Sequence, residues 1–226
     1  MRILALETST SWCSVAIGDG RDWHERAVDA GNAHSTLLLP MIRRALAGAD
    51  WPLSSLDAIA FGAGPGSFTG LRIGCGVAQG LALGSDRPVV PVGTLAALAL
   101  ADGGARVVAC LDARMREVYV AAYARDGEAL REVIAPAVLA PDAVAGPGQG
   151  GWRGAGNGFL AYPDLAARLR LDDVDPTARP MARAVGRLAV ARVAAGETVR
   201  AAEALPFYVR HRVALTTAER SAGALL

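Results

Sequence analysis

The sequence predicts an α/β protein of two related halves with a cleft between them. Apolar strand-like segments alternate with helical ones along the first hundred residues. A glycine-rich turn, residues 62–74, joins one of these strands to a helix. After Asp102-Gly103-Gly104 the opening pattern of strand, acid-ended turn, strand and hairpin starts again. We therefore expect one half over residues 1–103 and a second over residues 104–226.

The elements of the first half follow from short apolar runs, turn residues and helical periodicity. Strands are predicted over 2–7, 13–17 and 23–28, with a polar turn at 8–11 and a hairpin at Asp19-Gly20. The order then continues with a helix over about 33–46, a strand over 56–61, a helix over 70–83, a strand over 88–92 and a helix over about 94–101.

The second half repeats the opening of the first. Strands are predicted over 106–111 and 117–124, around a polar turn at 112–114 and before a hairpin at Asp126-Gly127. Residues 141–158 are rich in glycine and proline and are interpreted as a loop, and 182–195 as a helix. No element is assigned after Ala214.

Composition excludes several classes of protein. The chain of 226 residues is 52% hydrophobic and 20% charged, as in globular proteins. Its net charge of +1 does not indicate a strongly basic surface for binding nucleic acid. It contains no lysine, which excludes a P-loop lysine and a Schiff-base lysine. Cys13, Cys75 and Cys110 are far apart in apolar contexts and are expected to be buried free thiols. Without a signal peptide or a long apolar stretch, the expected location is the cytoplasm, with no membrane contact.

The glycine-rich turn does not match a known phosphate loop or nucleophile loop. A dinucleotide fingerprint that starts at Gly64 would need glycine where Thr69 stands, and a nucleophile elbow around Ser67 would need glycine in place of Pro65. Ser67 is better interpreted as a helix N-cap or as a hydroxyl that contacts phosphate. A tight turn that only feeds a helix explains the glycines equally well.

Two carboxylates stand at corresponding strand ends of the two halves. Glu7 and Asp112, facing each other across the cleft, would hold a hydrated magnesium ion beside nucleotide phosphates, although acids that only cap turns fit as well. The candidate nucleotide cleft comprises Glu7, Thr8, Ser9, Gly64, Ser67, Asp112 and Arg114. We expect weak ATP or ADP binding there, and no obligatory cofactor.

Two helices carry more apolar and small residues than one buried face requires. Gly70, Gly74 and Ala78 recur every four residues, as do Gly76 and Gly80, although each mid-helix glycine costs about 1 kcal/mol relative to alanine. Contact with another subunit or tight packing on the protein's own sheet would explain them. His34 begins the other helix without a second histidine at ligand spacing, so a packing or hydrogen-bonding role is expected rather than a metal site.

Five motifs resemble the TsaB (YeaZ) family of bacterial tRNA threonylcarbamoyladenosine biosynthesis. They are Leu4-Ala5-Leu6-Glu7-Thr8-Ser9-Thr10, His34-Ser35-(x)-Leu37-Leu38-Leu39-Pro40, Gly64-Pro65-Gly66-Ser67-Phe68-Thr69-Gly70-Leu71-Arg72-Ile73-Gly74, Asp112-Ala113-Arg114-Met115-(x)-Glu117-Val118-Tyr119 and Pro206-(x)-Tyr208-(x)-Arg210. The resemblance spans about residues 2–212. It implies an actin/Hsp70/sugar-kinase-like (ASKHA, ribonuclease H-like) fold of two related lobes and no catalysis by this chain.

The resemblance also implies partners. The related catalytic subunit, TsaD, binds a metal through an Asn-His-x-x-x-His segment, whose histidines are replaced here by Thr94 and Leu98. The family binds TsaD, and forms homodimers when alone, through two helices that correspond to about 34–46 and 70–83. With the ATPase TsaE, the assembly transfers a threonylcarbamoyl group to adenosine 37 of tRNA, so tRNA is reached through the complex. The implied interface comprises His34, Leu37, Leu38, Met41, Ile42, Leu71, Gly74, Cys75 and Ala78.

Two other functions remain as alternatives to a non-catalytic scaffold. A nucleotide-hydrolysing or phosphotransferring enzyme of the same fold would use Glu7 and Asp112, and a peptidase would use Ser67 or a metal. Glu7 stands where many relatives carry aspartate, which lengthens the side chain by one methylene. The absence of lysine and of paired histidines weakens both alternatives.

Overall fold

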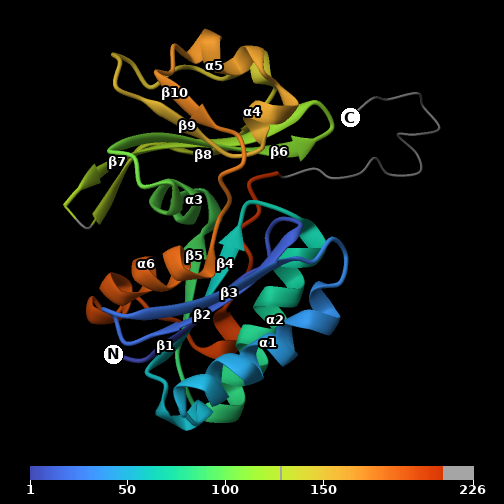
Figure 1. Cartoon of the computed structure of the whole chain (residues 1–226), viewed down its shortest axis with the longest axis vertical. Coiled ribbons are helices and arrows are strands. Elements are labelled where there is room, and N and C mark those ends of the chain that lie inside the picture. Colours follow the sequence, from blue (N-terminus) through green and yellow to red (C-terminus); the bar gives the residue numbers. More distant parts are fainter. Residues whose placement is uncertain (128, 211–226) are drawn as a thin grey trace.

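Two five-stranded sheets organise the protein, and the structure, a computed structural model, describes residues 1–127 and 129–210. The first sheet has the strand order β3-β2-β1-β4-β5 and the second has β10-β9-β6-β7-β8. Figure 1 shows the half that contains the N-terminus below and the second sheet above. The predicted α/β class with two related halves is therefore confirmed.

The first sheet is covered by helices on both faces. Its strands are β1 (Ile3–Glu7), β2 (Trp12–Gly18), β3 (Trp23–Asp29), β4 (Ala58–Gly64) and β5 (Val89–Gly93). The long helices α1 (His34–Ala49) and α2 (Phe68–Ser85) cover one face, and α3 (Thr94–Asp102) and α6 (Ala182–Ala194) cover the other. Every residue of β1 is consequently buried, which explains why this strand is a continuous apolar run up to Glu7.

The second sheet shares α3 with the first. Its strands are β6 (Arg106–Arg114), β7 (Glu117–Asp126), β8 (Ala129–Leu139), β9 (Arg153–Ala155) and β10 (Asp173–Asp175). The short helices α4 (Gly158–Ala161) and α5 (Asp164–Leu169) pack on its outer face. Because Leu95 and Leu98 of α3 pack on this sheet while Ala97 and Leu100 pack on the first, α3 lies between the two halves.

The order of strands and helices up to β7 agrees with the sequence prediction, and α2 begins two residues earlier than expected. The strand β8 had no counterpart in the prediction, and β9 lies inside the stretch 141–158 that was interpreted as a loop. Short 3-10 helices at Leu53–Ser55, Pro141–Ala143 and Ala201–Glu203 complete the described elements.

The end of the chain returns to the first half. Helix α6 packs on the first sheet, Val199 pairs with Val89, and the amide of Phe207 donates to the carbonyl of Ala63 (2.6 Å). The predicted division after residue 103 therefore follows the two sheets, but residues 182–207 lie with the first half. Residues 211–226 of the predicted second half, His211 included, are outside the described residues.

Candidate functional site

A cavity of about 700 Å³ opens between the two halves, and we refer to it as the cleft. Four of the seven predicted nucleotide-cleft residues line it: Ser9, Ser67, Asp112 and Arg114. The other three, Glu7, Thr8 and Gly64, are buried beneath its wall. The structure thus brings four of the predicted residues to one cavity, while the other three support its wall.

The glycines of the turn after β4 are required by the close approach of the end of β1. A Cβ atom on Gly70 would lie 2.0 Å from the carbonyl oxygen of Thr8, and one on Gly74 would lie 2.4 Å from the Thr8 hydroxyl. That hydroxyl donates a hydrogen bond to the carbonyl of Gly70 (2.8 Å). Packing on the protein's own sheet, one of the two explanations left open, therefore accounts for this row of small residues.

Ser67 is the N-cap of α2, as predicted. Its hydroxyl accepts a hydrogen bond from the amide of Gly70 (3.3 Å), and its own amide donates to the carbonyl of Ser9 (2.7 Å). Thr94 also has a structural role, because its hydroxyl accepts from the amide of Gly64 (3.1 Å) while fully buried. The first turn of α2 contributes Ser67 and Phe68 to the cleft wall, where the positive end of the helix dipole favours anions.

Glu7 does not reach the cleft. Its side chain is buried, with Oε1 accepting from the amide (2.6 Å) and the hydroxyl of Ser9. Among the described residues, Oε2 has no hydrogen-bond partner, and it lies where a Cβ on Gly62 would stand. Burial raises the pKa of Glu7 above its usual value, and burial with the nearby Glu7 charge raises the pKa of Cys13 to about 11. The expected pair of Glu7 and Asp112 facing each other across the cavity is therefore not formed.

The second half presents Asp112 and Arg114 to the cleft from the end of β6, at the turn into β7. Their side chains form an ion pair (3.2 Å), and the amide of Asp112 donates to Oδ1 of Asn157 (3.1 Å). Arg210 fixes this turn from the end of the chain, because its guanidinium pairs with Glu117 and donates to the carbonyl of Ala113. A segment anchored on the first half at Phe207 thus connects to the second half beside the cleft.

Pairs of arginine and aromatic side chains border the cleft, and the sequence analysis missed most of them. The guanidinium of Arg179 lies 3.8 Å from the ring centroid of Trp12, and that of Arg72 lies 4.0 Å from Phe68. The rings of Phe68 and Tyr208 are 5.7 Å apart. These residues come from four distant segments. Phe68, Arg72 and Tyr208 stand in the quoted motifs, whereas Trp12 and Arg179 stand in none of them. Such pairs offer both charge and a flat apolar surface to a ligand.

Most of the predicted interface residues belong to the core of the first half. Eight of them are buried: His34, Leu38, Met41, Ile42, Leu71, Gly74, Cys75 and Ala78. Leu37 is half-buried, and the ring of His34 forms a hydrogen bond with the carbonyl of Trp12 (3.3 Å), which confirms its structural role. Residues of the same helices are exposed instead, with Leu39 at 47% and Leu83 at 79%.

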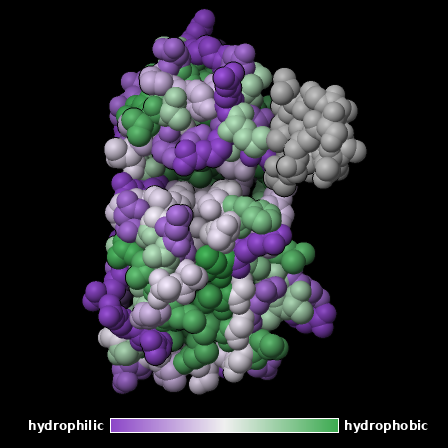
Figure 2. Space-filling view, turned by 90° about the vertical axis from the view of Figure 1, so that its right-hand side faces the viewer, coloured by the Kyte–Doolittle hydropathy of each residue, from purple (hydrophilic) through white to green (hydrophobic). Residues whose placement is uncertain are grey.

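On its exposed side α2 presents a second row of glycines. Built Cβ atoms on Gly76, Gly80 and Gly84 would meet nothing within 4 Å. We call Leu39, Gly76, Gly80, Leu83 and Gly84 the α1–α2 face. Figure 2 looks at the side on which α1 and α2 lie and shows hydrophobic residues gathered over the lower half of the molecule. This face is apolar and is shaped for close approach.

The part of the chain that the structure describes contains neither a metal-binding cluster nor a membrane-spanning helix. Residues 1–127 and 129–210 contain no group of three or more histidine, cysteine, aspartate or glutamate side chains that would hold a metal ion. Within the same ranges, every helix is too short or too polar to cross a membrane.

Comparison with known proteins gives a consistent result. Residues 28–201 match the family described as TsaD, tRNA N6-adenosine threonylcarbamoyltransferase. The "tRNA threonylcarbamoyladenosine biosynthesis protein TsaB" of Escherichia coli K12 is 40% identical over 95% of this chain and 96% of that protein. Its Haemophilus influenzae namesake is 38% identical over 94% of this chain and 95% of its own length.

A solved structure of similar sequence has the same fold as this chain. YeaZ from Pseudomonas aeruginosa superposes with a TM-score of 0.85 at 41% identity, covering 92% of this chain and 99% of that chain. The two sheets thus form the actin/Hsp70/sugar-kinase-like fold that the motifs implied. By sequence motifs, family match and fold, the chain belongs to the TsaB (YeaZ) family of tRNA threonylcarbamoyladenosine biosynthesis proteins.

Proposed function

We propose that this chain is a non-catalytic subunit that binds TsaD through the α1–α2 face. With the ATPase TsaE, the assembly supports transfer of a threonylcarbamoyl group to adenosine 37 of tRNA in the cytoplasm, and tRNA is bound through the complex. Alone, the chain forms a homodimer through the same face, so that TsaD and a second copy compete for it.

The observation that carries this proposal is the outer row of glycines on α2. A mid-helix glycine costs about 1 kcal/mol relative to alanine, and no described residue lies near enough to require its lack of a side chain at Gly76, Gly80 or Gly84. A partner helix that approaches the backbone of α2 closely would gain contact area from these positions. Leu83, at 79% exposure, would add apolar surface to that contact.

The test measures complex formation by size-exclusion chromatography with light scattering, on this chain mixed with the TsaD of its organism. Gly80→Arg and Leu83→Glu place bulk and charge on exposed positions and are expected to abolish the heterodimer without unfolding the chain. The matched control is Leu160→Glu, because Leu160 is a helical leucine of similar exposure (70%) in the other half. No complex at micromolar concentration, even with TsaE and ATP present, would refute the proposal.

The cleft supports a second, weaker proposal, namely ATP or ADP binding without hydrolysis. The N-terminus of α2 and the guanidinium groups of Arg114 and Arg179 offer positive charge to phosphates at the cavity wall. Hydrolysis would need the Glu7 carboxylate at the cavity, whereas its contacts lie in the core. Equilibrium dialysis with ATP is expected to show binding that weakens in Arg179→Gln, with no release of phosphate. Turnover by the isolated chain that is lost in Asp112→Asn would favour the hydrolytic alternative.

A further inference from the structure

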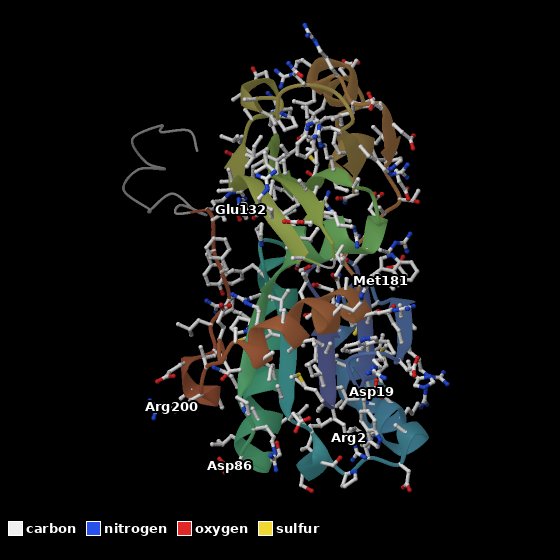
Figure 3. The ribbon with its side chains drawn as sticks, turned by 90° about the vertical axis from the view of Figure 1, so that its left-hand side faces the viewer. Arg2, Asp19, Asp86, Glu132, Met181 and Arg200 are labelled. Carbon is white, nitrogen blue, oxygen red and sulfur yellow. The ribbon has the colours of Figure 1, made fainter. Side chains whose placement is uncertain are left out.

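A second cavity, of about 580 Å³, opens between the halves on another wall of the molecule from the cleft. It shares no lining residue with the cleft and is bounded by β3, α3, β7 and α6. Figure 3 faces this side and labels Met181, which lies where the two halves meet, at the start of α6. We call it the arginine cavity, after the lining side chains of Arg125, Arg183 and Arg187.

Arg125 contributes a buried donor without a partner. Its backbone amide donates to the carbonyl of Ala105 (2.7 Å), which fixes the residue near the end of β7. Its side-chain Nε is shielded from solvent, and no acceptor among the described residues lies within hydrogen-bonding distance of it. A guanidinium is always charged, so a shielded N–H without an acceptor is costly unless a ligand supplies one.

Arg183 projects from the first turn of α6, and Arg187 stands one turn further along the same helix. The amide of Arg183 is already used, because it donates to Oε1 of Glu25 (2.8 Å). The amide of Ala182 donates to the hydroxyl of Ser14 (2.9 Å). These first amides of α6 are therefore capped, and the attraction for an anion comes from the side chains rather than from the helix end.

Glu25 is the acidic residue in the lining of this cavity. Among the described lining residues, the guanidinium groups of Arg125 and Arg183 face this carboxyl group, so their combined positive charge exceeds its negative charge even when Glu25 is ionised. Burial raises the pKa of Glu25 above its usual value, against the lowering effect of the Arg183 amide and charge. The remaining lining is partly apolar and includes Leu100 and Ala184, which are both buried.

We propose that the arginine cavity binds a phosphate-bearing small molecule. Its phosphate oxygens would accept from Nε of Arg125 and from the guanidinium of Arg183, since planar guanidinium donors match phosphate geometry. The negative charge of the phosphate would offset the excess of positive charge that Arg125 and Arg183 have over Glu25. Leu100 and Ala184 would contact the less polar part of an organic phosphate. This site is independent of the α1–α2 face and of the cleft.

The test is isothermal titration calorimetry of the whole chain with two probes, pyrophosphate and AMP, at low ionic strength. Apart from any binding in the cleft, we expect a site in the arginine cavity whose affinity for the probe Arg125→Gln and Arg183→Gln each lower by about tenfold, the effect of losing one charge-assisted hydrogen bond. Two controls should leave the affinity unchanged: Arg114→Gln, which alters the cleft, and Arg21→Gln, which alters an exposed arginine outside both cavities. Binding of pyrophosphate alone would indicate an inorganic phosphate ligand, and binding of AMP alone would indicate an organic phosphate.

One variant is expected to act in the opposite direction. Glu25→Gln keeps an oxygen for the Arg183 amide but removes the opposing charge, so the probe should bind more tightly. Circular dichroism melting checks that each variant is folded, and the exposed Arg183 keeps the test valid if Arg125→Gln is unstable. The proposal is overturned if neither probe binds at millimolar concentration, or if binding is lost in Arg114→Gln and survives in Arg183→Gln.

Discussion

Gly70 and Gly74 on the inner face of α2 differ from Gly76 and Gly80 on its outer face in what surrounds them. The inner pair lies against Thr8, so close that a methyl group would overlap its atoms. The outer pair faces open space. Both rows have the same four-residue spacing. The spacing therefore indicates close approach of another segment, but it does not show whether that segment belongs to this chain or to a partner.

The largest effect is expected for Gly70→Ala. The new Cβ would lie 2.0 Å from the Thr8 carbonyl oxygen, a backbone atom that cannot rotate away, and the free energy of unfolding should fall by about 3 kcal/mol. Urea denaturation followed by circular dichroism measures this change. Gly76→Ala is the matched control from the outer row. Equal stability of these two variants would remove the distinction between the rows.

Glu7, buried beside the inner row, predicts a pH-dependent effect of Glu7→Gln. Burial raises its folded-state pKa above the ordinary 4.5, so the folded protein keeps a proton that the unfolded chain releases. The contribution of protonated Glu7 to wild-type stability is therefore fully present below pH 4.5. It is lost as the pH rises from 4.5 through the raised folded-state pKa. The free energy of unfolding of the variant, relative to that of the wild type, should therefore increase with pH by at most about 1.4 kcal/mol per pH unit. Parallel stability curves of the variant and the wild type from pH 4 to 8 would contradict a raised folded-state pKa of Glu7.

Thr8→Val tests the hydrogen bond under the inner row. The substitution keeps the shape of the side chain but removes the buried hydroxyl that donates to the Gly70 carbonyl, which should cost about 1 kcal/mol of stability. Thr36→Val is the control, because the Thr36 hydroxyl also donates to a carbonyl, that of Ala33, but in an exposed position. Thermal unfolding compares the two, and a larger loss for the control would argue against tight packing at Thr8.

The smallest effect, of opposite sign, is expected for Gly80→Ala. Alanine favours a helix over glycine by about 1 kcal/mol, and open space lies around this position, so the isolated chain should become slightly more stable. The same methyl group should weaken the proposed complex with TsaD, because it would separate the backbones of the two helices. Melting temperature and TsaD affinity are measured on the same preparation. A variant that is more stable and binds TsaD as well as the wild type would leave the outer glycines without a role in that interface.

Local patterns were sufficient for most of the fold. Continuous apolar runs predicted the buried strands β1 and β4. Ser67 was predicted as an N-cap because a serine hydroxyl can cap the helix that follows it, whatever that helix packs against. The strand β8 was missed because its residues are half-buried in no clear alternation, and β9 because three residues carry too little pattern.

The candidate sites were harder to predict because they depend on contacts between distant segments. Leu38 and Ile42 were assigned to an interface on their apolar character, which indicates burial but does not say against which chain. Glu7 was placed in the cleft because it and Asp112 stand at corresponding strand ends of the two halves. The pair of Trp12 and Arg179 had no local signature at all.

Helix α6 has a consequence for how the protein is made. It covers one face of the first sheet, yet it follows the strands of both sheets in the chain and leaves the ribosome after them. While the rest of the chain is being synthesised, the apolar surface formed by Ile3, Ala5 and Val90 lacks this cover. The first half therefore cannot fold as an independent N-terminal unit during translation, and a chain truncated before residue 182 would be exposed to aggregation and proteolysis.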